Sequence, residues 1–177
     1  MDQELYQLIQ KAKQGSQESF AELVNRYKGH VFRHAYAMVN DRMEAEDISQ
    51  EAFVKAYYSL SKLKNEYAFV SWLTRIVSNL CYDHIEKSKK KTAIPTEDII
   101  KDHSSPVEQL QIKLNIEEGL QKLTAEHRTV LILRDIQGFS YSEIAEILQI
   151  PLGTVKSRIN TARQELKNEL LRGEDHE

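Results

Sequence analysis

Cysteine, proline and glycine are scarce in this chain of 177 residues. Cys81 is the only cysteine, so neither an intramolecular disulfide nor a thiolate metal cluster can form. With three prolines and six glycines the chain has few helix breakers, whereas Leu, Ile, Glu, Lys, Gln and Ala recur throughout. Those residues lose little rotamer freedom in a helix. The composition therefore predicts an all-helical protein.

Long apolar runs are missing as well. No segment approaches the roughly 20 apolar residues that a membrane-spanning helix needs. The first 15 residues lack the basic region and apolar run of a signal peptide. We therefore expect a cytoplasmic protein without membrane insertion. The net charge of −3 argues against a histone-like binder but leaves room for a local DNA-binding surface.

Helical spacing of apolar residues predicts two helical units. In residues 1–90 the predicted helices are a first that stops near Gly15, a second capped by Ser16, a third over about residues 31–39, then Glu44–Leu60 and Phe69–Lys87. Residues 88–106 are charged, hold two prolines and carry no sustained period. We therefore divide the chain into a bundle at 1–90, a flexible linker at 91–105 and a second unit at 106–172.

The second unit has clear helix starts. Ser105-Pro106-Val107-Glu108 combines a capping serine, proline at the first helical position and glutamate at the third. The predicted helices are Pro106–Lys122, Ala125–Ile136, Tyr141–Leu148 and Leu152–Leu171, with Thr124 and Ser140 as caps. The last two, with a tight break at 149–151, form a helix-turn-helix pattern, whose second helix enters the DNA major groove.

The last helix is chemically suited to DNA. From Leu152 to Arg172 it has five basic and two acidic residues in a chain that is negative overall. Donor-rich or small residues near its amino end are suited to base edges and phosphates: Gly153, Thr154, Lys156, Ser157, Arg158 and Asn160. Gln149 opens the turn, where glycine is usual, and a left-handed conformation there costs about 1 kcal/mol. The alternative is a pair of core helices with a solvated basic face.

Two surfaces are predicted on the first unit. Asp47, Gln50, Glu51 and Val54 fall at i, i+3, i+4 and i+7, which places them on one outward stripe. In Phe69–Lys87 the expected outward residues are Arg75, Ser78, Asn79, Tyr82 and Glu86, followed by lysines. Aromatic, amide and basic groups together indicate a single-stranded DNA surface. Solvated faces are the alternative for both, and we expect Trp72 to lie in the core.

Three segments together resemble the extracytoplasmic-function (ECF) sigma factors of the sigma-70 family. They are EAEDISQEAFVKAY at 44–57, FVSWLTRIVSNLCYDHIEKSKKK at 69–91 and LTAEHRTVLILRDIQGFSYSEIAEILQIPLGTVKSRINTAR at 123–163. The resemblance implies a factor that binds core RNA polymerase, through the clamp of the largest subunit and the flap of the second-largest. It also implies promoter DNA and an anti-sigma factor, membrane-anchored in many members, as partners. Gln149 and Glu86 depart from the family pattern.

The resemblance also implies site residues. Polymerase binding is assigned to Asp47, Gln50, Glu51 and Phe53. The minus-10 element is assigned to Lys62, Lys64, Asn65, Arg75, Asn79, Tyr82 and Lys87, with the loop at 61–68 and Asn79 forming a pocket for a flipped base. The minus-35 element is assigned to Gly153, Thr154, Lys156, Ser157, Arg158, Asn160 and Arg163. No cofactor, metal or catalytic residue is expected.

Two other functions are compatible with parts of the sequence. One is a one-component helix-turn-helix regulator, in which residues 1–90 sense a signal or dimerise. Such a regulator binds paired half-sites without polymerase. The other is a helical metalloenzyme using His30 and His34, which are four residues apart. The segment HVFRH lacks the general-base glutamate of a zincin motif and has no evident third ligand.

Overall fold

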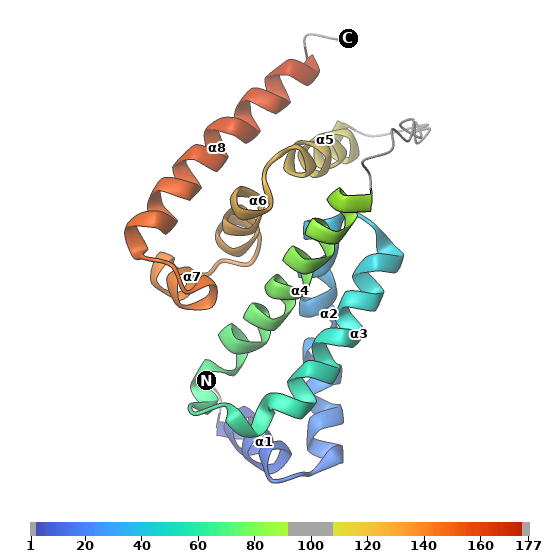
Figure 1. The fold of residues 1–177 in the computed structure, drawn as a ribbon, viewed down its shortest axis with the longest axis vertical. Coiled ribbons are helices and arrows are strands. Elements are labelled where there is room, and N and C mark those ends of the chain that lie inside the picture. Colours follow the sequence, from blue (N-terminus) through green and yellow to red (C-terminus); the bar gives the residue numbers. More distant parts are fainter. Residues whose placement is uncertain (1–2, 92–107, 175–177) are drawn as a thin grey trace.

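The computed structural model describes residues 3–91 and 108–174, and every regular element in these ranges is helical (Figure 1). The first unit contains α1 (Gln3–Lys13), α2 (Gln17–Val39), α3 (Arg42–Ser59), the 3-10 helices η1 (Leu60–Lys62) and η2 (Glu66–Ala68), and α4 (Phe69–Lys91). The second unit contains α5 (Glu108–Lys122), α6 (Ala125–Leu131), the π-helical turn η3 (Ile132–Ile136), α7 (Tyr141–Leu148) and α8 (Leu152–Glu174). The predicted all-α class is confirmed.

Most predicted helix starts are confirmed by side-chain caps. Ser16 accepts a hydrogen bond from the backbone N–H of Ser19, and Thr124 accepts one from His127. Ser140 and Glu143 form a reciprocal capping box at the start of α7. The predicted cap Ser105 and residues 92–105 of the predicted linker lie outside the described residues, whereas residue 91 is the last of α4. Local sequence therefore determines where these helices begin.

The prediction of two helices between Ser16 and Val39 was wrong, because α2 is continuous over this range. A glycine within a helix costs roughly 0.5–1 kcal/mol relative to alanine, and Gly29 lies in the middle of α2. The same helix face stays buried on both sides of it, through Leu23, Val31 and Ala35. Burial of this face offsets the glycine and keeps the helix unbroken.

Each unit has its own apolar core. The core of the first unit is built by α1 to α4 and includes Ile9, Leu23, Phe69 and Leu73. Trp72 is partly buried and packs against this core, as expected. The second unit has a core in which Ile144, Ile147, Val155 and Ile159 join α7 to α8. The predicted helix-turn-helix is thereby present as a packed element.

The two units also pack against each other, with the second beside α2 and α4 (Figure 1). Ile132 of η3 belongs to the core of the first unit. Arg128 of α6 is buried, and its guanidinium donates to the carbonyl oxygen of Met38 at the end of α2. It also donates to carbonyl oxygens at the end of α5, namely those of Leu120, Gln121 and Leu123. One side chain thus connects the ends of two helices from different units.

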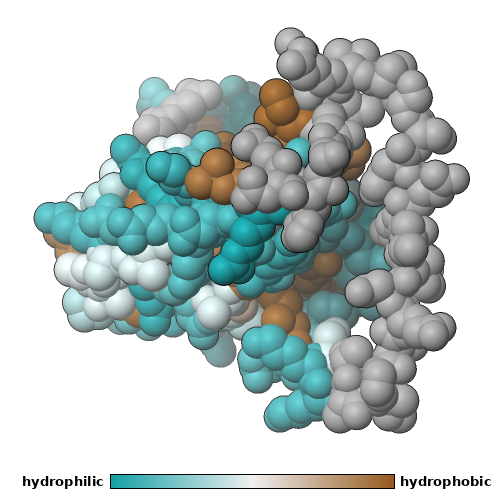
Figure 2. Space-filling model, turned by 90° about the horizontal axis from the view of Figure 1, so that it is seen from above, coloured by the Kyte–Doolittle hydropathy of each residue, from teal (hydrophilic) through white to brown (hydrophobic). Residues whose placement is uncertain are grey.

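Seen from above, the molecule presents mainly hydrophilic side chains with separate hydrophobic patches between them (Figure 2). Three apolar side chains of the second unit, Ile112, Ile116 and Ile136, are well exposed. They line a groove of about 430 Å³ between α2 and α5, together with Phe32 and Tyr36. In the described ranges, no helix combines the length and the apolar character needed to cross a membrane.

Candidate nucleic-acid interface

One exposed stripe runs along α3. Asp41 caps this helix, and Ala45, Ile48, Ala52 and Ala56 bury its opposite face. Asp47, Gln50 and Glu51 are exposed, as predicted, whereas Phe53 is partly buried against the core of the first unit. Glu51 forms an ion pair with Lys55 over 3.2 Å. The helix therefore presents these carboxylates to solvent.

The exposed stripe of α3 is longer than the sequence predicted. Met43 and Tyr58 are each 77% exposed, and they continue the spacing of Asp47 and Val54 by one turn at either end. Their positions four residues before Asp47 and four after Val54 could have revealed them. Methionine and tyrosine are enriched at surfaces that bind another protein.

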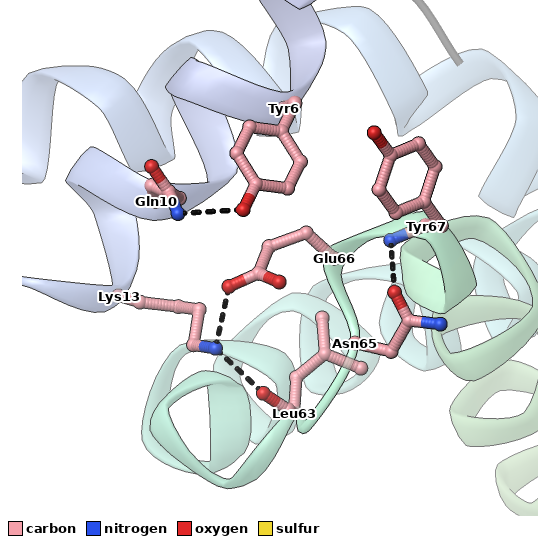
Figure 3. Close-up of polar contacts among 7 residues, drawn as sticks. All are labelled: Tyr6, Gln10, Lys13, Leu63, Asn65, Glu66 and Tyr67. Atoms are coloured by element: carbon pink, nitrogen blue, oxygen red, sulfur yellow. Dashed lines mark hydrogen bonds and ion pairs between the residues drawn. The ribbon is translucent and has the colours of Figure 1, made fainter.

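The loop between α3 and α4 presents three of the predicted minus-10 residues. Lys62, Lys64 and Asn65 are exposed. The Asn65 side chain accepts a hydrogen bond of 3.0 Å from the backbone N–H of Tyr67 and so caps η2 (Figure 3). The exposed lysines leave the loop with a positive surface, while the asparagine orders its second half.

The predicted outward face of α4 is only partly open. Asn79 and Lys87 are exposed, but Ser78 is buried, which contradicts its predicted place on the outward stripe. Its hydroxyl lies 3.0 Å from Nε2 of His34 and donates to the carbonyl oxygen of Thr74. Ser78 packs against α2 of its own unit, and Gln137 of the second unit lies at the other ring nitrogen of the same His34.

Two more minus-10 residues of α4 face the second unit. Arg75 donates to the side-chain oxygen of Gln149 over 2.7 Å. Burial raises the pKa of Tyr82, while the neighbouring Thr129 side chain lowers it. Arg158 also influences this pKa through its charge. The intended DNA face of α4 is therefore in contact with α6 and the turn before α8.

The loop and Asn79 occupy different heights along α4. Ten residues separate Phe69, where α4 begins, from Asn79, which corresponds to about 15 Å of helix. The described hydrogen bonds of the loop go to α1 and within the loop, not to the middle of α4. The predicted pocket formed by the loop and Asn79 stays a prediction.

Gln149 has the left-handed conformation predicted for the turn, with φ 53° and ψ 46°. The amino end of α8 follows and projects into solvent. Gly153, Lys156, Ser157 and Asn160 are exposed there, and Thr154 and Arg158 are half-buried. A Cβ at Gly153 would meet no atom within 4 Å, so nothing inside the protein requires glycine at this position. This end of the helix is available to a ligand.

Arg163 differs from the other predicted minus-35 residues. Its guanidinium makes two contacts with the carboxylate of Asp135, of 2.6 and 3.2 Å. The side chains are 47% and 43% exposed, so water screens the pair. Glu86, the other departure from the family pattern, is exposed and lies 3.5 Å from Lys89. A phosphate contact by Arg163 must compete with Asp135.

The two histidines considered as metal ligands serve the protein interior. His34 is buried between Ser78 and Gln137, which lie 3.0 and 3.1 Å from its two ring nitrogens. Burial lowers the pKa of His34 to about 4. His30 lies 3.3 Å from the Thr74 hydroxyl. Within residues 3–91 and 108–174, no group of three His, Cys, Asp or Glu residues could hold a metal ion.

Comparisons with known proteins cover both units. Residues 23–91 match the family described as Sigma-70 region 2, and residues 113–166 match Sigma-70, region 4. The chain is 35% identical to the ECF RNA polymerase sigma factor SigW of Bacillus subtilis, over 96% of this chain and 98% of that protein. It is 33% identical to the RNA polymerase sigma-H factor of Pseudomonas aeruginosa, over 93% and 92% respectively.

Solved structures give the same result. The fold is similar to that of the sigma factor RpoE from Bartonella quintana in complex with the anti-sigma factor NepR, with TM-score 0.70, 25% identity, and coverage of 88% of this chain and 98% of that one. It is also similar to CnrH in complex with the cytosolic domain of CnrY, with TM-score 0.72, 25% identity, and coverage of 93% and 96%. None of these comparisons supports a one-component regulator. The chain belongs to the ECF sigma factors of the sigma-70 family and is a sigma factor for transcription initiation.

Proposed function

We propose that this factor docks on the clamp of the largest RNA polymerase subunit through α3. Asp47, Gln50 and Glu51 supply an acidic and amide surface, and Met43 and Tyr58 extend it with apolar contacts. Such a combination of charge and apolar area provides both steering and affinity at a protein interface. Phe53 supports the stripe from within, because it packs on the core of the first unit.

The second unit binds the minus-35 element with α8. Lys156, Ser157 and Asn160 are exposed at the helix end that reads base edges in a helix-turn-helix. Thr154 and Arg158 flank them. Gly153 allows close approach of a phosphate to the helix amino end, which carries a partial positive charge. The free space around Gly153 supports this role, since no packing requirement explains the glycine.

The first unit opens and holds the minus-10 element. Lys62, Lys64 and Asn65 contact the unpaired strand at the loop, and Arg75, Asn79, Tyr82 and Lys87 follow it along α4. Exposed amides can hydrogen-bond to base edges only after the bases leave the duplex. The loop at 61–68 and Asn79 together hold a base flipped from this strand.

Promoter binding requires the units to separate. The two promoter elements lie about 25 base pairs apart, roughly 85 Å of B-form DNA at about 3.4 Å per base pair. In the structure, Arg75 of the first unit and Gln149 beside α8 are in hydrogen-bond contact. The packed arrangement is therefore a resting form, and DNA-bound holoenzyme contains a separated form. Arg75 and Tyr82 become available to DNA in that form.

Chemical cross-linking tests this separation. A variant with Arg75→Cys and Gln149→Cys, joined by a short bis-maleimide, should lose promoter activity, while each single variant should keep more of it. Cys81 will not interfere, because it is buried and burial raises the pKa of its thiol to about 12. Full activity of the cross-linked protein would show that the units need not part.

An anti-sigma factor is the proposed inhibitory partner. The RpoE neighbour is described in complex with an anti-sigma factor, and the apolar groove between α2 and α5 gives this chain a place to hold an apolar helix. We propose that the factor acts in the cytoplasm and that the inhibitor is anchored in the membrane. No catalytic step is assigned to this chain.

One observation supports the proposal most strongly. The exposed stripe of α3, the exposed residues of the following loop and α4, and the helix-turn-helix of α7 and α8 follow one another in a single chain. Run-off transcription with purified core polymerase tests it directly. Addition of the factor should produce defined transcripts from a genomic template, and the mapped starts should share two upstream elements. Binding to DNA without any effect on core polymerase would refute it.

A further inference from the structure

A buried histidine lies where the two units meet. His34 of α2 is 1% exposed. Its Nε2 lies 3.0 Å from the hydroxyl of Ser78 on α4, and its Nδ1 lies 3.1 Å from the side-chain amide nitrogen of Gln137, directly after η3. Ser78 belongs to the first unit and Gln137 to the second. One of the two hydrogen bonds of this ring therefore joins the units.

The hydrogen bonds of its neighbours determine the protonation state of this ring. The Ser78 hydroxyl donates its proton to the carbonyl oxygen of Thr74, so toward His34 it acts as an acceptor for a proton on Nε2. Nδ1 then carries no proton and accepts from the amide nitrogen of Gln137, which is a donor. The neutral imidazole therefore fits this position, with one hydrogen bond on each side.

A second proton on the ring would disturb this arrangement. A protonated Nδ1 would face the N–H groups of Gln137, which are donors as well. If the amide turned over, its oxygen could accept the new proton, but its nitrogen would then take the present position of Oε1. That position is buried and has no hydrogen-bond partner among the described residues. Either arrangement leaves a buried polar group unpaired, which destabilises the contact between the units.

The charges near His34 do not compensate a positive ring. The charged or titratable side chains close to these contacts come from four elements: His30, Arg33 and Tyr36 of α2, Arg75, Cys81 and Tyr82 of α4, Glu126, His127 and Arg128 of α6, and Arg134 and Asp135 of η3. The two carboxylates among them are exposed, and Asp135 pairs with Arg163. Burial lowers the pKa of His34 to about 4, and the charge of His30 lowers it further. The packed form therefore disfavours the protonated ring.

We propose that His34 is a pH-sensitive switch between the packed and separated forms of this factor. The neutral ring joins the units through Gln137, and protonation in mild acid favours their separation. The inference rests on the separated form given under the proposed function, and it adds a chemical signal, the proton, that shifts the balance between the two forms.

The direction and size of the effect follow from the difference in proton affinity between the two forms. When Gln137 leaves, water reaches the ring, and the pKa of His34 returns toward the ordinary value of about 6.5. The histidine therefore favours the packed form fully above about pH 6.5, and this contribution is lost as the pH falls toward 4. Between pH 7.5 and 5.5 the ratio of separated to packed protein should rise about five- to tenfold.

Labelling of a cysteine placed between the units measures this ratio. Thr129 of α6 is 0% exposed, and its hydroxyl lies 3.2 Å from Sδ of Met38 in the first unit. A thiol reagent should therefore reach Thr129→Cys only when the units separate, and mass spectrometry distinguishes it from Cys81. The labelling rate of the free, full-length protein is divided by the rate of the same variant unfolded in urea, which cancels the pH dependence of the thiol. This relative rate should rise about five- to tenfold from pH 7.5 to 5.5.

Three substitutions in the Thr129→Cys protein test the role of His34. His34→Gln cannot gain a proton, so its relative rate should not depend on pH. Gln137→Glu places a carboxylate beside Nδ1, which pairs with the protonated ring, so acid should no longer increase its rate. His30→Gln is the matched control. His30 lies 3.3 Å from the Thr74 hydroxyl of its own unit, so its replacement should leave the rise in place.

Several results would overturn the inference. Equal relative rates of Thr129→Cys at both pH values would exclude the switch, as would an undiminished rise in His34→Gln or in Gln137→Glu. Loss of the rise in His30→Gln alone would assign the effect to the other histidine. Circular dichroism checks that each variant is folded, and if His34→Gln is not, Gln137→Glu decides. The measurement needs neither polymerase nor DNA, so failure of the switch and failure of the proposed function are distinguishable.

Discussion

The helices α4 and α8 are both 23 residues long, and both are predicted to bind promoter DNA. They differ in how much of the predicted DNA-binding face is exposed to solvent. On α8 the base-reading end is in solvent. On α4, Arg75 is bonded to Gln149 and Tyr82 is covered by the second unit. The difference matches the form of DNA that we propose for each helix. Duplex DNA can be read at once, whereas α4 needs DNA that has already been opened.

The largest effect should come from disrupting the surface on which both helices depend. Reversing Asp47 and Glu51 to lysine should weaken binding to core polymerase by several kcal/mol, because like charges then face the basic clamp. The functions of α4 and α8 should be lost together. Both side chains are exposed, so helical content should stay the same. Unchanged affinity in a pull-down with core polymerase would contradict the docking assignment.

Asn79→Ala should impair promoter opening by α4 while leaving minus-35 binding by α8 intact. Loss of one or two hydrogen bonds to an unpaired base should cost on the order of 1–3 kcal/mol, about ten- to a hundredfold in open complex. Protection of the minus-35 region in footprints should persist, because α8 is unchanged. A template mismatched across the minus-10 region should recover part of the loss. Equal transcription by variant and parent on both templates would leave Asn79 without this role.

Within α8, the contrast between Lys156 and Arg163 sharpens the assignment of base contacts. Lys156→Ala or Ser157→Ala should change minus-35 sequence preference by about 1–3 kcal/mol. Arg163→Ala should weaken all sequences alike and reduce the salt slope by roughly one unit. Since Asp135 competes for Arg163, Asp135→Asn should strengthen DNA binding slightly. A change in preference with Arg163→Ala alone would show that the register is wrong.

The free energy of unfolding should depend on pH through His34, which packs against the buried side of α4. Burial lowers the pKa of His34 to about 4, so the unfolded chain, with a pKa near 6.5, binds the proton more readily. Stability should therefore fall as the pH decreases from about 6.5 toward 4, by about 2 kcal/mol at pH 5. Urea unfolding of the parent and of His34→Gln measures this. His30, whose pKa burial also lowers, adds a smaller change that both proteins share.

The sequence predicted what depends on short-range chemistry. Capping residues such as Ser16 and Ser140, and the left-handed Gln149, are local signals whose physical basis lies within a few neighbouring residues. The fold class and the exposed stripe of α3 follow from periodicity in the same way. The division of residues 17–39 into two helices was wrong, because burial of one face along the whole of α2 keeps the helix continuous.

The contacts between the two units could not be predicted from the sequence. Ser78 was predicted to face outward, but its hydroxyl lies against His34 of α2, whose other ring nitrogen is bonded to Gln137 of the second unit. Arginine is usually a surface residue, so the sequence did not predict that Arg128 is buried. Its partners are backbone carbonyl oxygens, which every residue has and which no sequence motif therefore marks. The periodicity of apolar residues does not predict such a partner, because the contact joins a side chain to backbone groups of another unit. The covered half of α4 was missed for this reason.

Arg128 has a consequence for how easily the molecule can be taken apart and rejoined. When the units separate, its bond to Met38 is exchanged for water, but its bonds to Leu120, Gln121 and Leu123 lie within the second unit and stay intact. The buried positive charge never loses all its acceptors, so separation avoids the several kcal/mol that stranding a charge would cost. In the proposed separation the second unit would leave the first without losing its own hydrogen bonds to Arg128.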